Sequence, residues 1–143
     1  MKSDKNVPRI LSMDGVGQFL NPDEDQKNFQ NIYKIIERLP TMRSWAYKLV
    51  DSKSNSMTLI SQMPGEGNRF HSHPDWDEVW IIYEGKWYIQ FSDGENCRYV
   101  TDGDIVFVER GRTHKITCVG TDRAVRLAIS RYDVAHVYTE EDY

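Results

Sequence analysis

The sequence lacks what several large classes of protein require. Its 143 residues include only two cysteines, Cys97 and Cys118, and these form neither a CxxC pair nor a disulfide framework. The longest apolar run, residues 79–83, is far shorter than the roughly 20 residues that a transmembrane helix needs. With 18 basic and 22 acidic residues the net charge is −4, so no basic excess is available for a nucleic-acid backbone. We therefore expect neither a membrane protein nor a nucleic-acid partner.

The first ten residues, MKSDKNVPRI, lack the apolar stretch of a signal peptide, and we expect a cytoplasmic protein. What the chain does contain suits one folded domain. Apolar residues make up 39% and aromatic residues 12% of the sequence, which is enough to bury a core.

Residues 1–44 differ in pattern from the rest of the chain. The segment NPDED, residues 21–25, is typical of a helix start, because proline and acidic residues are favoured in a first turn. Pro40 would end such a helix. Between these signals, apolar residues recur every three or four positions, at Phe29, Ile32, Tyr33, Ile36 and Leu39. We predict an amphipathic helix that packs across a sheet edge or against a subunit partner.

From Trp45 onward, short apolar runs alternate with turns rich in Gly, Asn and Asp, which favours an antiparallel barrel or sandwich. The predicted fold class is all-β with a short N-terminal helical segment. We divide the chain into an arm and helix (1–44), a barrel (45–133) and an acidic tail (134–143) that we expect to fray. The strands are predicted at 45–50, 57–63, 69–73, 78–83, 86–91, 97–100, 105–108, 114–119 and 123–130.

Three of the four histidines, together with one acid, have a spacing that suits a metal site. His71 and His73 form His-x-His in a predicted strand, so both side chains point to one face. Glu78 opens the next predicted strand and His114 opens a much later one. Three imidazoles and one carboxylate suit Fe, Mn, Ni, Co or Zn and leave open coordination positions. The alternative interpretation is an exposed polar strand face with an ordinary surface acid.

The residues around this set resemble the two sequence motifs of the cupins. The first motif is complete, in the segment Gly65-EGNRF-His71-S-His73-PDWD-Glu78-VWIIYE-Gly85. The second fits at Gly103, Gly111 and His114, whereas Glu109 replaces its proline and Cys118 replaces its asparagine. The two motifs together cover residues 65–118.

The resemblance implies a double-stranded β-helix, the cupin barrel, with one divalent transition metal ion (Fe, Mn, Ni, Co or Zn) inside its mouth. By their motif positions, the ligands would be His71, His73, Glu78 and His114. The fourth histidine, His136, has no counterpart in either motif and lies in the predicted tail. We expect it at the surface or in an interface. The resemblance also implies a homodimer.

Arg69 is two residues before His71, so in a strand it shares the inward face of the histidines. A guanidinium beside a metal favours an anionic substrate, because two neighbouring positive charges inside a barrel need a negative one. We predict Arg69 and Glu78 as catalytic residues, with Arg69 also binding the substrate. The alternative is a structural ion pair of Arg69 with Glu66 or Glu78.

Three further residues are predicted to bind the substrate. Trp80 follows Glu78 on the inward face, and Cys118 follows His114 in the same way. Trp76 lies on the loop before Glu78, at the rim of the pocket. For Cys118 the alternative is a small apolar filler of the core.

The function predicted from these residues is that of a mononuclear metal enzyme acting on a small, anionic organic molecule. A dioxygenase-type oxidoreductase is favoured, by analogy with other small single-barrel cupins. An isomerase, epimerase, lyase or decarboxylase that uses Lewis-acid chemistry on a sugar or carboxylate is the alternative. A non-catalytic barrel that binds a small ligand or metal is a second alternative, although no helix-turn-helix pair accompanies it as in a typical sensor.

Overall fold

The computed structural model describes residues 2–131 and 134–138. The segment predicted as an arm and helix contains β1 (Lys2–Asp4), α1 (Val7–Met13), β2 (Phe19–Leu20), the 3-10 helix η1 (Glu24–Gln26) and α2 (Ile32–Arg38). The remaining elements are β3 (Trp45–Asp51), β4 (Ser56–Gln62), β5 (Glu78–Glu84), β6 (Lys86–Phe91), β7 (Arg98–Val100), β8 (Ile105–Val108), β9 (His114–Val119), β10 (Ala124–Ser130) and β11 (His136–Tyr138). The all-β fold class is confirmed.

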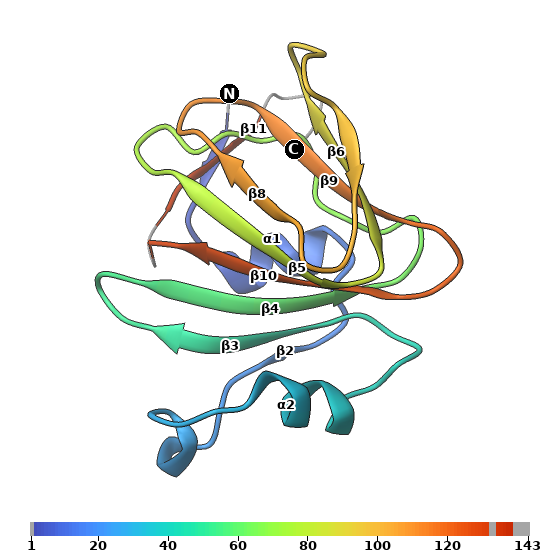
Figure 1. The fold of residues 1–143 in the computed structure, drawn as a ribbon. Helices are drawn as coiled ribbons and strands as arrows, with labels where there is room; N and C mark the ends of the chain where they lie inside the picture. The colour runs from blue at the N-terminus through green and yellow to red at the C-terminus, as the bar shows by residue number, and fades with distance from the viewer. Residues whose placement is uncertain (1, 132–133, 139–143) are drawn as a thin grey trace.

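The strands form two main sheets that face each other (Figure 1). The larger sheet has the order β2-β3-β4-β10-β5-β8, and the smaller has the order β7-β6-β9. Neighbouring strands are antiparallel except for the short β2, which runs parallel to β3. Between the sheets lies an apolar core that includes Ile82, Trp87 and Ile116. This is the double-stranded β-helix that the motifs imply.

The alternation of side chains along β5 and β9 follows the predicted pattern. Glu78, Trp80 and Ile82 of β5 are buried, and the residues between them are only partly so. On β9 the buried residues are His114, Ile116 and Cys118. Since successive residues of a strand point to opposite faces, each strand turns one polar metal-binding candidate and two further residues toward the interior.

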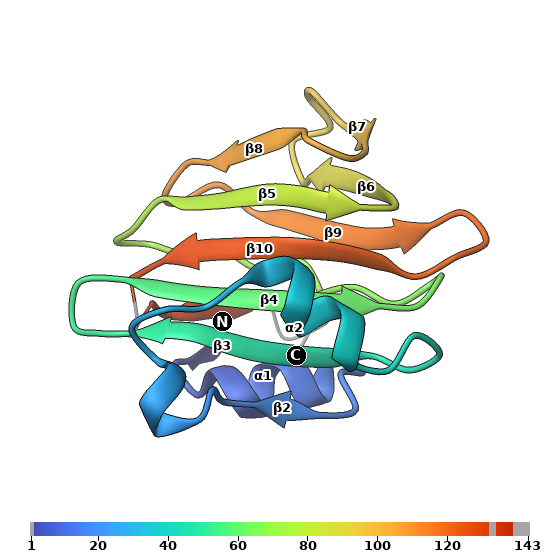
Figure 2. The same ribbon diagram turned by 60° about the horizontal axis from the view of Figure 1, so that its bottom comes forward.

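Helix α2 covers the outer face of the larger sheet (Figure 2). Its Ile35 and Ile36 are buried against a cluster that includes Trp45 and Leu59. The prediction of one helix from residue 22 to residue 39 is wrong, because the 3-10 helix η1 and the seven-residue α2 are separate. The Asn31 side chain caps α2 by accepting a hydrogen bond from the Lys34 backbone N–H (3.1 Å). Two members of the predicted apolar face are exposed, Phe29 and Tyr33.

Helix α1, which we did not predict, lies against the inner face of the larger sheet. The Asn6 side chain caps it, and its Leu11 packs with Ala46 and Ile60. The N-terminal segment is therefore not a detached arm, since it supplies one wall of the barrel interior. No helix within residues 2–131 and 134–138 is long and apolar enough to cross a membrane.

The predicted tail also belongs to the fold in part. Residues 136–138 form β11, which pairs with β1, and Val137 bridges to Ser72. Residues 139–143 lie outside the described residues. The strand predicted at 69–73 is wrong as a continuous strand, since only isolated bridges form there. The same segment crosses β9 closely at Gly67, where a Cβ would lie 2.0 Å from the carbonyl oxygen of Ile116, so only glycine fits.

Candidate metal centre

The four residues that the motifs predict as metal ligands lie in two overlapping groups of donors, which share His73. His71 and His114 are held side by side by two backbone hydrogen bonds, from His71 N to His114 O (3.0 Å) and from His114 N to His71 O (2.9 Å). Glu78 begins the neighbouring strand β5, and its Oε2 lies 3.3 Å from Nε2 of His73. One ligand atom each of His73, Glu78 and His114 lies within 4.8 Å of the others, so this group could hold a metal ion.

The backbone fixes the orientation of the imidazole rings. Nδ1 of His71 donates to the Arg69 carbonyl (2.7 Å), Nδ1 of His73 to that of Ala135 (2.9 Å) and Nδ1 of His114 to that of Arg112 (2.8 Å). A carbonyl oxygen only accepts, so each Nδ1 carries a proton, and in a neutral ring Nε2 then keeps the lone pair. Metal-binding histidines are oriented by this kind of second hydrogen bond.

Two of these ring nitrogens are fully buried and form no hydrogen bond with the described residues. Nε2 of His114 has no polar partner among them, and Nε2 of His73 faces the Glu78 carboxylate at 3.3 Å. A buried polar atom without a partner costs about 1–3 kcal/mol. The donor set therefore fits a metal ion, which would satisfy both nitrogens at once.

His136 is a fifth candidate donor, because its half-buried side chain lies against the histidine cluster and not apart from it at the surface, whereas a role in an interface stays a prediction. Val137 pairs with Ser72 in an antiparallel bridge. His136 and His73, the neighbours of these two residues, therefore point to the same face. The ring of His136 stacks on that of His71 with centroids 4.8 Å apart, and its Nδ1 donates to the Val134 carbonyl (3.3 Å). One ligand atom each of His71, His73 and His136 lies within 4.8 Å of the others. The scarcity of histidine in the sequence was the only signal for this role.

Burial keeps most of the imidazoles neutral. It lowers the pKa of His114 to about 4 and that of His136 to about 3, and it takes the pKa of His71 well below its ordinary value. Burial alone would raise the pKa of Glu78, but attraction to His73 outweighs it and lowers that pKa to about 2. His73 is the exception, because burial would lower its pKa but attraction to Glu78 outweighs burial and raises that pKa above its ordinary value. At neutral pH the site therefore presents one carboxylate and the neutral imidazoles of His71, His114 and His136, and a bound metal ion would displace a proton from His73.

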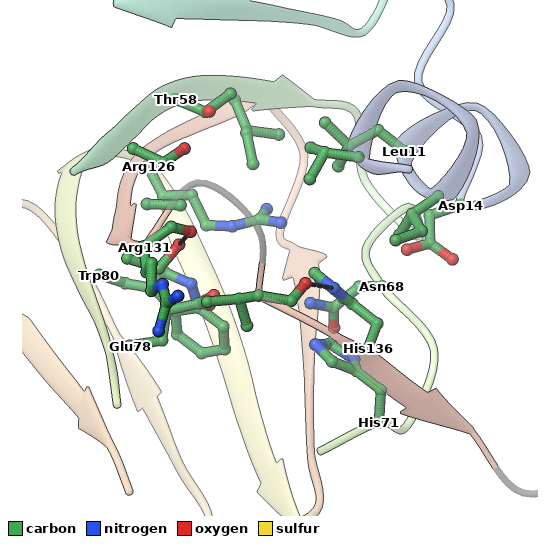
Figure 3. A pocket seen from close by; sticks show the side chains of 17 residues that line it. Leu11, Asp14, Thr58, Asn68, His71, Glu78, Trp80, Arg126, Arg131 and His136 are labelled. Atoms are coloured by element: carbon green, nitrogen blue, oxygen red, sulfur yellow. Dashed lines mark hydrogen bonds between the residues drawn. The ribbon is translucent and has the colours of Figure 1, made fainter. Parts of the chain in front are cut away.

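A small cavity of about 50 Å³ adjoins the donors (Figure 3). A single water needs roughly 10–15 Å³ on this measure, so the cavity admits only a small molecule. Its walls come from α1, the larger sheet and the histidine cluster. The residues labelled in Figure 3 are Leu11, Asp14, Thr58, Asn68, His71, Glu78, Trp80, Arg126, Arg131 and His136.

Arg69 is not among the residues that line this cavity. Its Nε donates to Oδ1 of Asp14 (2.5 Å), and its guanidinium lies over the ring of Tyr138, 4.4 Å from the centroid. The prediction that it faces the substrate pocket is therefore wrong, and its acidic partner is neither Glu66 nor Glu78. The partner is Asp14, which caps the C-terminal end of α1, a helix that the sequence did not predict.

Two arginines line the cavity, Arg126 and Arg131, and the fully buried one is Arg126 of β10, only 2% exposed (Figure 3). Its Nη1 donates to Oε1 of Gln62 (2.6 Å), and its guanidinium lies 4.6 Å from the ring centroid of Trp87. We did not predict it, although a single arginine inside the apolar run AVRLAIS was a usable signal. Burial lowers its pKa only to about 10, so it remains charged.

The other predicted substrate-binding residues occupy different places. Trp80 lines the cavity. Cys118 is fully buried in the core between the sheets and is not a lining residue, which fits its alternative role as a filler. Trp76 lies outside the cavity lining too, with the Arg131 guanidinium 5.4 Å from its ring centroid.

Known proteins resemble this chain in fold. One solved structure is the polyketide cyclase RemF from Streptomyces resistomycificus, with 19% identity over 73% of this chain and 79% of that one, at a TM-score of 0.61. A cupin-like protein from Thermotoga maritima has 24% identity over 71% and 82%, at 0.58. A predicted oxalate decarboxylase, also from Thermotoga maritima, has 19% over 62% and 79%, at 0.56.

Identities this low show a common fold and nothing finer. No curated protein matches the chain. A profile of the cupin domain, however, matches residues 58–130, half of the 143 residues. That match spans both motifs and the four ligands they imply, and the chain therefore belongs to the cupin family.

Proposed function

We propose that this protein is a metal-dependent enzyme that acts on a small organic anion. The observation that carries the proposal is the convergence of buried imidazole nitrogens and the Glu78 carboxylate beside a small cavity. A non-catalytic metal or ligand barrel would also need donors, but it would not need an ionisable group in the cavity wall, and Asp14 is such a group.

The residues that would hold the ion are His71, His73, Glu78 and His114, with His136 as a further donor. When bound, the ion would supply a Lewis acid that polarises a substrate oxygen, or a redox centre if it is iron or manganese. Glu78 would offset part of its charge. Trp80 and Leu11 wall the cavity with apolar surface and so exclude bulk water from the reacting groups.

Asp14 supports proton transfer as the chemistry of the site. Its Oδ2 is buried and forms no hydrogen bond within the described residues, while Oδ1 accepts from Arg69. Burial raises the pKa of Asp14 in spite of the Arg69 charge. A carboxyl with a raised pKa in a cavity wall suits a general acid or base.

We therefore place a metal-assisted isomerase or lyase first and the dioxygenase-type oxidoreductase second. Polyketide cyclase and predicted oxalate decarboxylase are the names of two similar structures, and neither names an oxygenase. The dioxygenase remains a candidate because the donor set suits iron and manganese as well as zinc.

The metal is tested first, by elemental analysis of protein purified without chelators. We expect close to one transition metal ion per chain in the wild type and loss of that ion in His73→Ala and His114→Ala. Lys115→Ala, which changes the neighbouring residue on the opposite side of β9, is the matched control and should keep the metal. A wild-type protein that binds no transition metal, or full occupancy in both histidine variants, would contradict the proposal.

The reaction class is tested on the metal-loaded protein. Hydroxy acids, aromatic diols and sugar phosphates are supplied in turn, with oxygen consumption and substrate conversion measured together. We expect conversion without oxygen uptake, and Asp14→Asn should keep its metal and lose turnover. Oxygen uptake that matches conversion would replace the isomerase or lyase with the dioxygenase.

A homodimer also stays a prediction, to be tested by mass measurement in solution.

A further inference from the structure

Arg126 is a buried positive charge with no carboxylate of the described residues at ion-pair distance, although Glu78 and Asp14 attract it from farther away. It forms no ion pair with them, and its single hydrogen bond to them is the one from Nη1 to the amide oxygen of Gln62. Other buried or half-buried arginines of this chain are paired, as Arg69 is with Asp14 and Arg123 with Glu84. Burying a charge is unfavourable unless it is paired, so Arg126 needs an explanation that its neighbours do not give.

The surroundings of Arg126 stabilise a cation but do not neutralise it. The faces of Trp87 and Trp80 lie 4.6 Å and 5.9 Å from its guanidinium carbon, which is within the range of a cation–π contact. The nearest donor cluster adds to the positive charge once a divalent ion is bound, because Glu78 offsets only one of its two charges. The interior of the barrel then carries an excess of positive charge that an anion would balance.

The donor atoms of Arg126 also point to a particular kind of anion. Nη1 is used by Gln62, whereas Nε is buried and forms no hydrogen bond. Nη2 likewise forms none with the described residues. Nε and Nη2 lie on one edge of the planar guanidinium, and two parallel N–H groups on such an edge match the two oxygens of a carboxylate.

We propose that Arg126 is the substrate-binding cation of this cavity and that it takes the carboxylate of a small organic acid. This inference rests on the proposed function, because it assigns the substrate class of the same site. It moves the role that the sequence suggested for Arg69 to a residue that lies in the cavity wall.

The size of the cavity further limits which organic acids can be the substrate. A volume of about 50 Å³ exceeds what one water needs by a factor of only a few. It suits an acid with a handful of non-hydrogen atoms, whose carboxylate meets Arg126 while another oxygen reaches the donor cluster. It does not suit a sugar phosphate or a polyketide unless α1 moves away from the sheet.

The test is calorimetric titration of malonate and, separately, of inorganic phosphate into metal-loaded protein. In Arg126→Gln we expect malonate binding to weaken by roughly 10-fold or more with the metal content unchanged, as for the loss of a charged hydrogen bond. Arg98→Gln, a change of an exposed arginine, is the matched control and should bind malonate like the wild type. Arg69→Gln tests the competing assignment.

Arg126→Lys guards against a folding defect in the glutamine variant. It keeps the charge and loses the planar fork, so we expect folded protein with full metal and intermediate malonate affinity. Malonate binding that is equal in wild type, Arg126→Gln and Arg126→Lys would overturn the inference, as would a wild type that binds no malonate or that binds phosphate more tightly. A larger loss in Arg69→Gln than in Arg126→Gln would overturn it too. Metal content is measured in the same samples, so a wild type without metal identifies failure of the proposed function instead.

Discussion

The two faces of the larger sheet are built from the same strands and have opposite chemistry. The outer face, beneath α2, is an apolar cluster with Trp45, Leu59 and Leu127 at its centre. The inner face carries buried polar groups at the alternate positions, among them Glu78 on β5 and Arg126 on β10. Two adjacent residues of β10, Arg126 and Leu127, thus belong to the two different environments.

The difference separates stability from function within one sheet. Apolar burial on the outer face contributes about 25 cal/mol for each Å² removed from water. The inner face instead holds a buried polar atom without a hydrogen bond, Nε of Arg126, and such an atom opposes folding. A fold retains such groups when a ligand satisfies them. The stability gained by apolar burial on the outer face therefore offsets the free-energy cost of the polar groups on the inner face.

The largest effect is expected on the outer face. Leu59→Ala removes a fully buried side chain from the cluster beneath α2, and we expect the free energy of unfolding to fall by about 2–5 kcal/mol. Denaturant unfolding measures the loss. The metal content of the folded variant should equal that of the wild type. Loss of metal without a loss of stability would show that the two faces do not divide the roles in this way.

A smaller effect is expected at His136 of β11, in the donor cluster beside the cavity. If it is an additional ligand, His136→Ala should lower metal affinity by roughly 10–100-fold, less than His73→Ala, because four donors remain. Competition with a chelator of known affinity gives the difference. Val137→Ala, on the same strand but the opposite face, is the control for loss of β11 packing. Equal affinity in His136→Ala and the wild type would make His136 a wall of the site only.

The same comparison explains how much could be predicted from the sequence. The strands of both sheets except the two-residue β2 were recovered, because side-chain alternation and turn residues are local signals, and His71, His73, Glu78 and His114 carry spacings that a motif fixes. Their convergence is a consequence of the barrel, so correct strands were enough to bring them together.

The parts of the fold and of the site that the sequence did not predict depend on contacts between distant segments. Helix α1 has seven residues and β11 has three, and elements this short are not stable by themselves. Helix α1 forms because Leu11 packs on Ala46 and Ile60, and β11 forms because β1 and Ser72 pair with it. The ion pair of Arg69 with Asp14 and the position of His136 follow from these two elements, and no local pattern shows either.

The smallest effect concerns Cys118 of β9, in the smaller sheet, whose side chain lies in the apolar core between the sheets. Its Sγ–H donates weakly to the Asp122 carbonyl (3.7 Å), and burial raises its pKa to about 11. An ordinary thiol is half ionised near pH 8.5, by contrast. At that pH iodoacetamide should therefore label the partly exposed Cys97 and leave Cys118 unmodified in folded protein, which peptide mass spectrometry can measure.

Unfolding in urea provides the control, since both thiols should then react. Because the pKa of Cys118 is higher in the folded state, its contribution to stability is complete below about pH 8.5 and is lost as the pH rises toward about 11. Labelling of folded Cys118 should appear only over that interval. Equal labelling of the two cysteines at pH 8.5 would mean that solvent reaches the apolar core between the sheets, and not only the cavity beside the histidines.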